Sequence, residues 1–169
     1  KVAEQAEKLH LGTLSSYTWG GGTIYGATNY GSRITRTITS PTASGWTGST
    51  LLGEILAMRQ DSQDAYHYGP WMLYVGTAWD RYLDDDFKTN SDISLRERIK
   101  KVSDIQDVKT LDYLSGYDML LVQMTSDVIR TVIGMDITTV QWETKGGLQV
   151  NFKVMAILVP QLRADFNSN

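Results

Sequence analysis

The alternation of apolar and polar positions divides the first part of the chain into a helix and a long irregular segment. Val2, Ala6 and Leu9 recur at helical spacing among Glu and Lys residues, which predicts a helix over residues 1–11. Residues 12–49 are crowded with Gly, Ser and Thr and predict an extended loop or short strands separated by turns.

A longer helix is predicted from Leu51 to about Tyr66. Apolar residues recur along one side of this segment, and Ser49 or Thr50 can cap its start. Gly69-Pro70 marks its end, because the residue before a proline is driven away from helical backbone angles.

The middle of the chain alternates short strands with short helices. A buried strand is predicted over 71–75, a short helix over 77–83, and a second helix over 94–102 that Ser94 can cap. Two further strands are predicted over 105–111 and 119–124.

The C-terminal third has the clearest pattern, which is that of a β-hairpin. Val140 and Trp142 alternate into the turn Lys145-Gly146-Gly147, and residues 148–154 alternate out of it. Residues 154–159 are apolar on both faces, so we expect the end of this strand to lie in a core. Strands and helices are mixed without a βαβ rhythm, which indicates an α+β fold.

Composition narrows the function classes. The 169 residues suffice for one domain, or one domain with a small lobe, and a net charge of −3 argues against a general nucleic-acid binder. The chain has no Cys, which excludes disulfides, a thiol nucleophile and Cys-based zinc sites, and fits a reducing compartment. No run of about 18 apolar residues is present to span a membrane. No signal peptide is visible, and the chain begins with Lys inside an apparent helix, so we expect missing upstream residues.

Aromatic residues are unusually frequent in the Gly/Thr-rich segment, unlike in a disordered linker. Large rings also serve at protein–protein interfaces. We therefore expect this segment to lie against a surface of its own chain or of a neighbour. The candidate subunit-contact residues are Tyr17, Trp19, Tyr25, Tyr30 and Trp46.

The acidic cluster of Asp80, Asp84, Asp85 and Asp86 is the strongest candidate for chemistry. Asp80 and Asp84 are four residues apart on a predicted helix, and carboxylate oxygens suit a hard cation. The spacing does not match a calcium loop, and three acids in a row point in different directions. A solvated helix end is the favoured interpretation.

Other motifs do not assemble into a catalytic or cofactor site. His10 and His67 have no ligand-spaced partner, and 19-WGGGTIYG-26 lacks the lysine of a phosphate loop, so its glycines are expected to bend the backbone. The basic residues near 94–102 alternate with Glu97 and are expected to form an ordinary solvated face. We expect no catalytic, cofactor-binding or metal-binding residue, although a serine–lysine pair stays open.

The order of elements resembles the shell proteins of encapsulins and the related major capsid proteins of tailed phages. The resemblance covers about residues 20–166. It is carried by 69-GPWMLYVGTAWDRYL-83 after a long helix, by the helix and strand in 94–111, by 118-DMLLVQMTSDVI-129, and by the closing hairpin 131–165 that ends near Pro160. Upstream, 24-IYGATNYGSR-33 is similar to the stretch where such chains leave their extended loop.

The resemblance implies the tailed-phage capsid fold, in which a peripheral lobe holds the long helix and β elements and an axial lobe holds a mixed sheet with short helices. Residues 1–68 would be part of the peripheral lobe, 69–130 the axial lobe, and 131–169 a hairpin returning to the peripheral lobe. The acids at 84–86 would lie near a rim or pore of the axial lobe. The family's N-terminal arm and extended loop are expected to be absent, which puts inter-subunit clasping in doubt.

The function implied is a structural major capsid protein, not an enzyme, which assembles with copies of itself, as pentamers and hexamers, into an icosahedral shell. Its location would be the virion, after assembly in the host cytoplasm, without a membrane or small-molecule partner. A packaged genome or a cargo protein stays open as a further partner. The alternative is an encapsulin-type compartment that encloses cargo. Rivals from other classes are a divalent-metal hydrolase using Asp80 and Asp84–Asp86, and a monomeric module that binds through its Tyr/Trp-rich segment.

Overall fold

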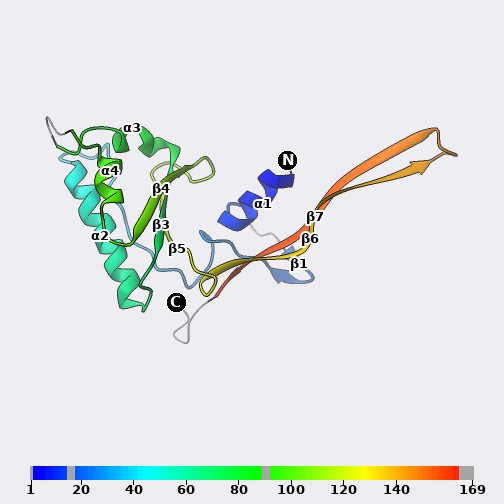
Figure 1. Ribbon diagram of the computed structural model, residues 1–169, viewed down its shortest axis with the longest axis horizontal. Helices are drawn as coiled ribbons and strands as arrows, with labels where there is room; N and C mark the ends of the chain where they lie inside the picture. The colour runs from blue at the N-terminus through cyan, green and yellow to red at the C-terminus, as the bar shows by residue number, and fades with distance from the viewer. Residues whose placement is uncertain (1, 15–17, 89–91, 164–169) are drawn as a thin grey trace. The chain divides into compact units, whose positions relative to one another are not determined.

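The computed structural model describes residues 2–14, 18–88 and 92–163, and it has the mixed α+β architecture that the sequence predicts. The chain forms two compact units (Figure 1). The first unit combines residues 1–31 with 129–163, and the second is built on residues 32–128.

The second unit contains the long helix α2 (Gly48–Asp64). The helix begins a turn earlier than predicted because Thr47 caps it, its Oγ1 accepting a hydrogen bond from the Thr50 N–H at 3.3 Å. It ends at Ala65, after which Tyr66 adopts left-handed backbone angles (φ 65°) and the His67 N–H donates to the Ser62 carbonyl at 2.9 Å.

Three strands form the sheet of this unit, and all three lie where the sequence predicts strands. β3 (Trp71–Gly76) is central, with β4 (Ile105–Leu111) parallel on one side and β5 (Met119–Gln123) antiparallel on the other. The parallel pair needs a long crossover, which the short helices supply.

That crossover consists of a 3-10 turn η1 (Thr77–Trp79) followed by helices α3 (Asp80–Leu83) and α4 (Leu95–Lys100). Ser94 caps α4 as predicted, its Oγ accepting from the Glu97 N–H at 3.3 Å. The two helices are joined by a loop whose legs pair at Asp86 and Ser94.

The core of the second unit lies between the sheet and its helices. Leu73 and Val75 of β3 are fully buried and alternate with half-buried Met72 and Tyr74, the period-two pattern of a strand. Each fully buried side chain of this kind stabilises the fold by about 1.5–3 kcal/mol. The buried cluster comprises Leu51, Leu52, Ile55, Leu73, Val75, Trp79, Leu83, Leu95, Ile99, Val102, Ile105 and Val108.

The first unit is built on a two-stranded ribbon, β6 (Ile129–Thr144) and β7 (Gln149–Leu162). Its turn lies at the predicted place, and Lys145, Gly146 and Gly147 all have positive φ there. The unit also contains helix α1 (Val2–Leu11) and a small hairpin of β1 (Thr18–Trp19) and β2 (Gly22–Thr23).

α1 packs on the part of the ribbon that is farther from the turn, here called the proximal half. His10 Nε2 lies 2.8 Å from Thr131 Oγ1, and Thr131 is directly opposite Pro160, which is buried. The distal half, Thr138–Thr144 paired with Gln149–Met155, extends beyond α1 (Figure 1).

The prediction that residues 154–159 lie in a core is wrong for this chain. Val154, Ile157 and Val159 are all exposed. The reason is that the ribbon has only two strands and that α1 covers only part of it, so apolar side chains outside that part stay exposed.

The compact units divide the chain near residues 31 and 128, whereas the predicted lobes divide it at 68 and 130. α2 belongs with the sheet because Leu51 and Ile55 share one core with Leu73. The identification of a peripheral and an axial lobe stays a prediction.

Candidate assembly surface

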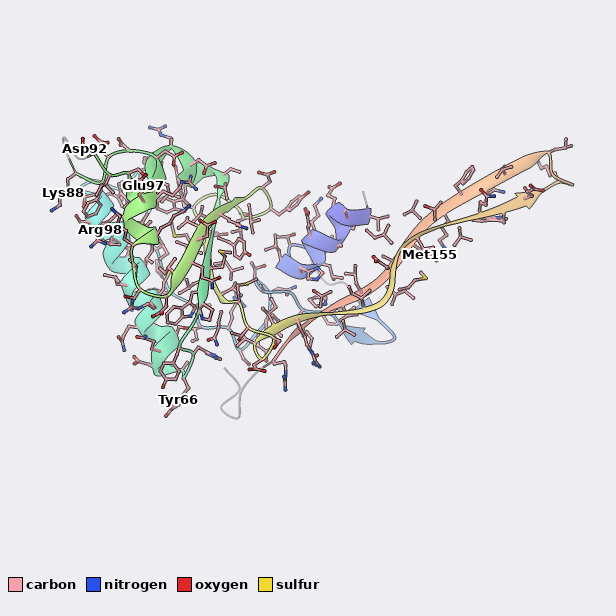
Figure 2. All side chains as sticks on the ribbon, viewed as in Figure 1. Tyr66, Lys88, Asp92, Glu97, Arg98 and Met155 are labelled. Atoms are coloured by element: carbon pink, nitrogen blue, oxygen red, sulfur yellow. The ribbon has the colours of Figure 1, made fainter. Side chains whose placement is uncertain are left out.

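Most of the exposed large apolar side chains among the described residues lie on the ribbon. Leu148, in the turn, is 90% exposed, Phe152 is 67% exposed and Ile133 is 61% exposed. Side chains stand off both faces of the ribbon, with Met155 labelled where the distal half begins (Figure 2). The other exposed large apolar residues of the ribbon are Val132, Ile137, Val140, Trp142, Val150, Val154, Ile157 and Val159.

One face of β7 is apolar along the whole strand. Residues with even numbers share this face, since successive strand side chains point to opposite sides and no extra residue interrupts β7. We call them the even row of β7: Val150, Phe152, Val154, Ala156, Leu158 and Pro160.

Burial along this row is greatest at the proximal end, beside α1, and lowest in the distal half. Pro160 is buried, Leu158 and Ala156 are half-buried, and Val154 and Phe152 are exposed. The chain's own helix therefore covers the proximal end of an apolar stripe and leaves its distal end in water.

The strand β6 does not compensate on that face. Val150, Phe152 and Val154 lie opposite Glu143, Gln141 and Thr139, all of them polar. On the reverse face the relation is inverted, with Val140 and Trp142 opposite Lys153 and Asn151. Each face of the distal half thus carries an apolar row on one strand beside a polar row on the other.

Such a ribbon is not expected to persist alone in water. An isolated two-stranded hairpin is marginally stable, and exposed contiguous apolar surface on a soluble protein marks an interaction site. Only five charged residues interrupt the ribbon, namely Arg130, Asp136, Glu143, Lys145 in the turn, and Lys153. The distal half of the ribbon is therefore the candidate assembly surface.

The predicted aromatic contact residues that the structure describes belong to different units of the chain. Tyr17 and the side chain of Trp19 lie outside the described residues. Tyr25 and Tyr30 of the first unit pack edge to face, with ring centroids 6.4 Å apart, and Tyr25 is exposed. Trp46 belongs to the second unit, where it packs against Trp79 and Tyr82 of its own core. Their role as subunit contacts stays a prediction.

The acidic cluster is organised by one arginine. Arg96 of α4 donates from Nε to Asp84 Oδ1 at 2.7 Å and from Nη2 to Asp80 Oδ1 at 2.9 Å (distances that make both contacts ion pairs). The hydroxyl of Thr110 on β4 also donates to Asp80 Oδ1, at 2.5 Å. These contacts fasten the short helices to each other and to the edge strand of the sheet.

The electrostatics of this cluster are those of a structural ion pair. The hydrogen bond from Thr110 lowers the pKa of Asp80 below its ordinary value, against the opposing effect of desolvation, and the bond and charge of Arg96 lower it further. For Arg96, burial opposes the charged form, but the hydrogen bonds to Asp84 and Asp80 outweigh it and raise the pKa of the guanidinium.

The other residues that the sequence analysis considered for chemistry do not form a site in the described ranges either. Asp85 Oδ1 accepts from the Asp86 N–H at 2.9 Å, which caps the loop rather than aiming a carboxylate at Asp80. Within the described ranges, no three His, Cys, Asp or Glu side chains lie close enough to hold a metal ion. Gly20 and Gly21, with φ of 59° and 83°, form the turn between β1 and β2, as expected for glycines that bend the backbone.

Sequence reasoning singled out aromatic residues of the irregular segment and missed the even row of β7. The signal is present in the alternation from 148 to 154, which predicts a strand of the hairpin and does not tell whether its apolar face is buried. Nothing local in the sequence shows that the described chain lacks a layer to bury that face.

No curated protein matches the sequence. Among solved structures, the fold is similar to that of a chain titled "Crystal structure of virus-like particle from Pyrococcus furiosus". The TM-score is 0.59 at 18% sequence identity, and the match covers 76% of this chain and 53% of that chain. The two therefore share a fold, and the match spans about half the length of the virus-like particle chain.

The chain belongs to the family of unknown function DUF6260, whose model matches residues 1–169. None of its helices, in the ranges that the structure describes, is long and apolar enough to cross a membrane.

Proposed function

We propose that this protein is a structural subunit that assembles with copies of itself into a closed protein shell. The observation that carries the proposal is the distal half of the β6–β7 ribbon, where apolar rows on both faces are exposed. An exposed apolar surface of this kind is removed from water when neighbouring subunits cover it, which favours assembly. The fold shared with a virus-like particle chain supports the same function.

The acidic cluster supports a structural role for the second unit. Asp80 and Asp84 share Arg96, and Thr110 takes part of the hydrogen-bonding capacity of Asp80. Carboxylates already neutralised by a guanidinium offer little to a divalent cation or to a proton-transfer step. The protein acts in this account without catalysis.

The finer proposal is a tailed-phage major capsid protein, in which residues 69–130 form the axial lobe of the subunit, and the long helix and the closing hairpin belong to its peripheral lobe. The resemblance of 69-GPWMLYVGTAWDRYL-83 and of the closing hairpin supports this proposal. The alternative is the shell of a cellular compartment that encloses cargo, which the same resemblance supports equally.

The test is negative-stain electron microscopy of the complete gene product after gel filtration. Closed particles of uniform diameter are expected. Absorbance spectra and nuclease treatment of particles purified from the native host then separate the two kinds of shell, since protected nucleic acid indicates a virion and a co-purifying enzyme indicates a compartment. A monomer at every concentration would contradict the proposal.

A further inference from the structure

The two edges of the ribbon differ. In the described part of the chain, β6 and β7 pair only with each other, so each has an outer edge of backbone groups without a partner strand. Such an edge is a template for pairing with another strand.

The outer edge of β6 is interrupted near its middle. Its register shifts on both sides of Met135, where β6 has extra residues relative to β7. The Asp136 carboxylate accepts from the Ile137 N–H at 2.7 Å, and the Thr138 hydroxyl donates to the Asp136 carbonyl at 3.0 Å. Bulges and a charged residue are the devices by which natural sheets blunt an edge.

The outer edge of β7 has fewer of these devices. It contains no extra residue from Gln149 to Val159, and Pro160 comes only after this stretch. Lys153 is the only charged residue on the strand. β7 is therefore the edge that can accept a partner strand.

From this edge and from the even row of β7, we infer that two copies of the chain pair through the outer edges of their β7 strands, antiparallel and about a two-fold axis. The inference rests on the proposed self-assembly and specifies one contact within it. Pairing would turn two ribbons into one four-stranded sheet, which meets the size at which sheets become stable.

The partner strand at the outer edge of β7 belongs to a second copy of the chain, because the even row of β7 is complementary to itself. Antiparallel pairing about a residue of β7 sets even residues against even residues. Val150, Phe152 and Val154 of both copies would then form one apolar stripe along the middle of the sheet, flanked by the polar rows of β6. On the reverse face, the polar residues of β7 would meet each other.

The side chains also allow a register without conflict. With the axis at Asn151, Phe152 lies opposite Val150 of the second copy, an aromatic against a β-branched residue, which is a favourable cross-strand pair. Lys153 lies opposite Gln149, so no like charges face each other. The interface is isologous, as a two-fold contact requires.

Single-cysteine variants of the complete gene product test this pairing, because the chain has no Cys of its own. The β7 variants are Gln149→Cys, Asn151→Cys and Lys153→Cys; the matched β6 variants are Thr139→Cys, Gln141→Cys and Glu143→Cys, at exposed positions. Directly opposed cross-strand residues lie within disulfide range. Under mild oxidation we expect one β7 position, Asn151→Cys for the register above, to form dimers about tenfold or more faster than any β6 position, because pairing raises the effective thiol concentration.

Equal rates on the two strands, in samples whose particles are intact by electron microscopy, would overturn the pairing and leave self-assembly standing. Fast formation of β7 dimers without particles would support the pairing and contradict the shell.

Hydrogen exchange of the unmodified protein provides a second measurement that needs no variant. For the register above, alternate amides between Gln149 and Lys153 should gain protection on assembly, and unchanged exchange there would overturn the inference. If these amides gained protection but no β7 variant formed crosslinks, another segment would cover the outer edge of β7, and the proposed pairing of two β7 strands would be overturned as well.

Discussion

Phe152 of β7 lies directly opposite Gln141 of β6, so the largest apolar side chain on this face of the ribbon has a polar neighbour across the strand pair. Phe152 is 67% exposed. The side chain therefore contributes little to the fold of its own chain and has most of its apolar surface free for a contact with another subunit.

Replacing Phe152 with Asp is expected to separate assembly from folding. The free energy of unfolding should change by less than about 0.5 kcal/mol, as for other exposed positions. Self-association should weaken by at least about tenfold, because a charge would enter an apolar contact. Light scattering coupled to gel filtration measures the second effect, and thermal melting measures the first.

Gln149→Asp is the matched control, since it changes the net charge by the same amount as Phe152→Asp and lies on the polar face of β7. A smaller loss of association is expected for this variant than for Phe152→Asp. Equal losses would show that net charge, and not the even row, decides the contact.

Leu73→Ala should have the opposite profile. Leu73 is fully buried between the sheet and its helices, so truncation removes apolar contacts and leaves a cavity. We expect the free energy of unfolding to fall by about 2–5 kcal/mol in denaturant titrations. A loss below 1 kcal/mol, on the order of a surface substitution, would contradict the assignment of this core.

Acid should weaken the contact between the short helices and the sheet. The folded pKa of Asp80 is lowered, chiefly by Thr110 and then by Arg96, so its contribution to stability is present above the ordinary carboxyl range. It is lost as the pH falls through the ordinary range to the lowered folded pKa, because the unfolded state binds the proton first. The carboxylate is nearly half exposed, so the contribution is at most about 1 kcal/mol. Denaturant titrations of Asp80→Asn across acidic pH should show a shallower pH dependence than those of the unmodified protein.

Divalent cations should not stabilise the protein. Asp80 and Asp84 are held by Arg96, so Mg²⁺, Mn²⁺ or Ca²⁺ at millimolar concentration is expected to leave the melting temperature unchanged. A rise that is abolished by Asp84→Asn would revive a metal site at these aspartates, since a ligand that binds only the folded state raises its melting temperature.

The elements that depend on local pattern could be predicted from the sequence. The turn Lys145-Gly146-Gly147 combines glycines with flanking alternation, and the strand 105–111 is recovered residue for residue. The start of α2 was placed too late because Thr47, Ser49 and Thr50 are all good caps, and only the fold selects Thr47.

Long-range relationships could not be predicted in the same way. The aspartates could be judged unlikely to converge, but Arg96 and Thr110 are 16 and 30 residues from Asp80, and no spacing rule connects them. The exposure of Val154, Ile157 and Val159 depends on how many strands the sheet has, which a strand's own pattern does not encode. The fold class was therefore accessible from the sequence, and the candidate assembly surface was not.

Sedimentation velocity of the complete gene product over a wide dilution series tests self-assembly most directly. We predict one large species of defined sedimentation coefficient, which persists on dilution and is replaced by small species in Phe152→Asp. A single species at the mass of one chain, unchanged at every concentration, would contradict the account.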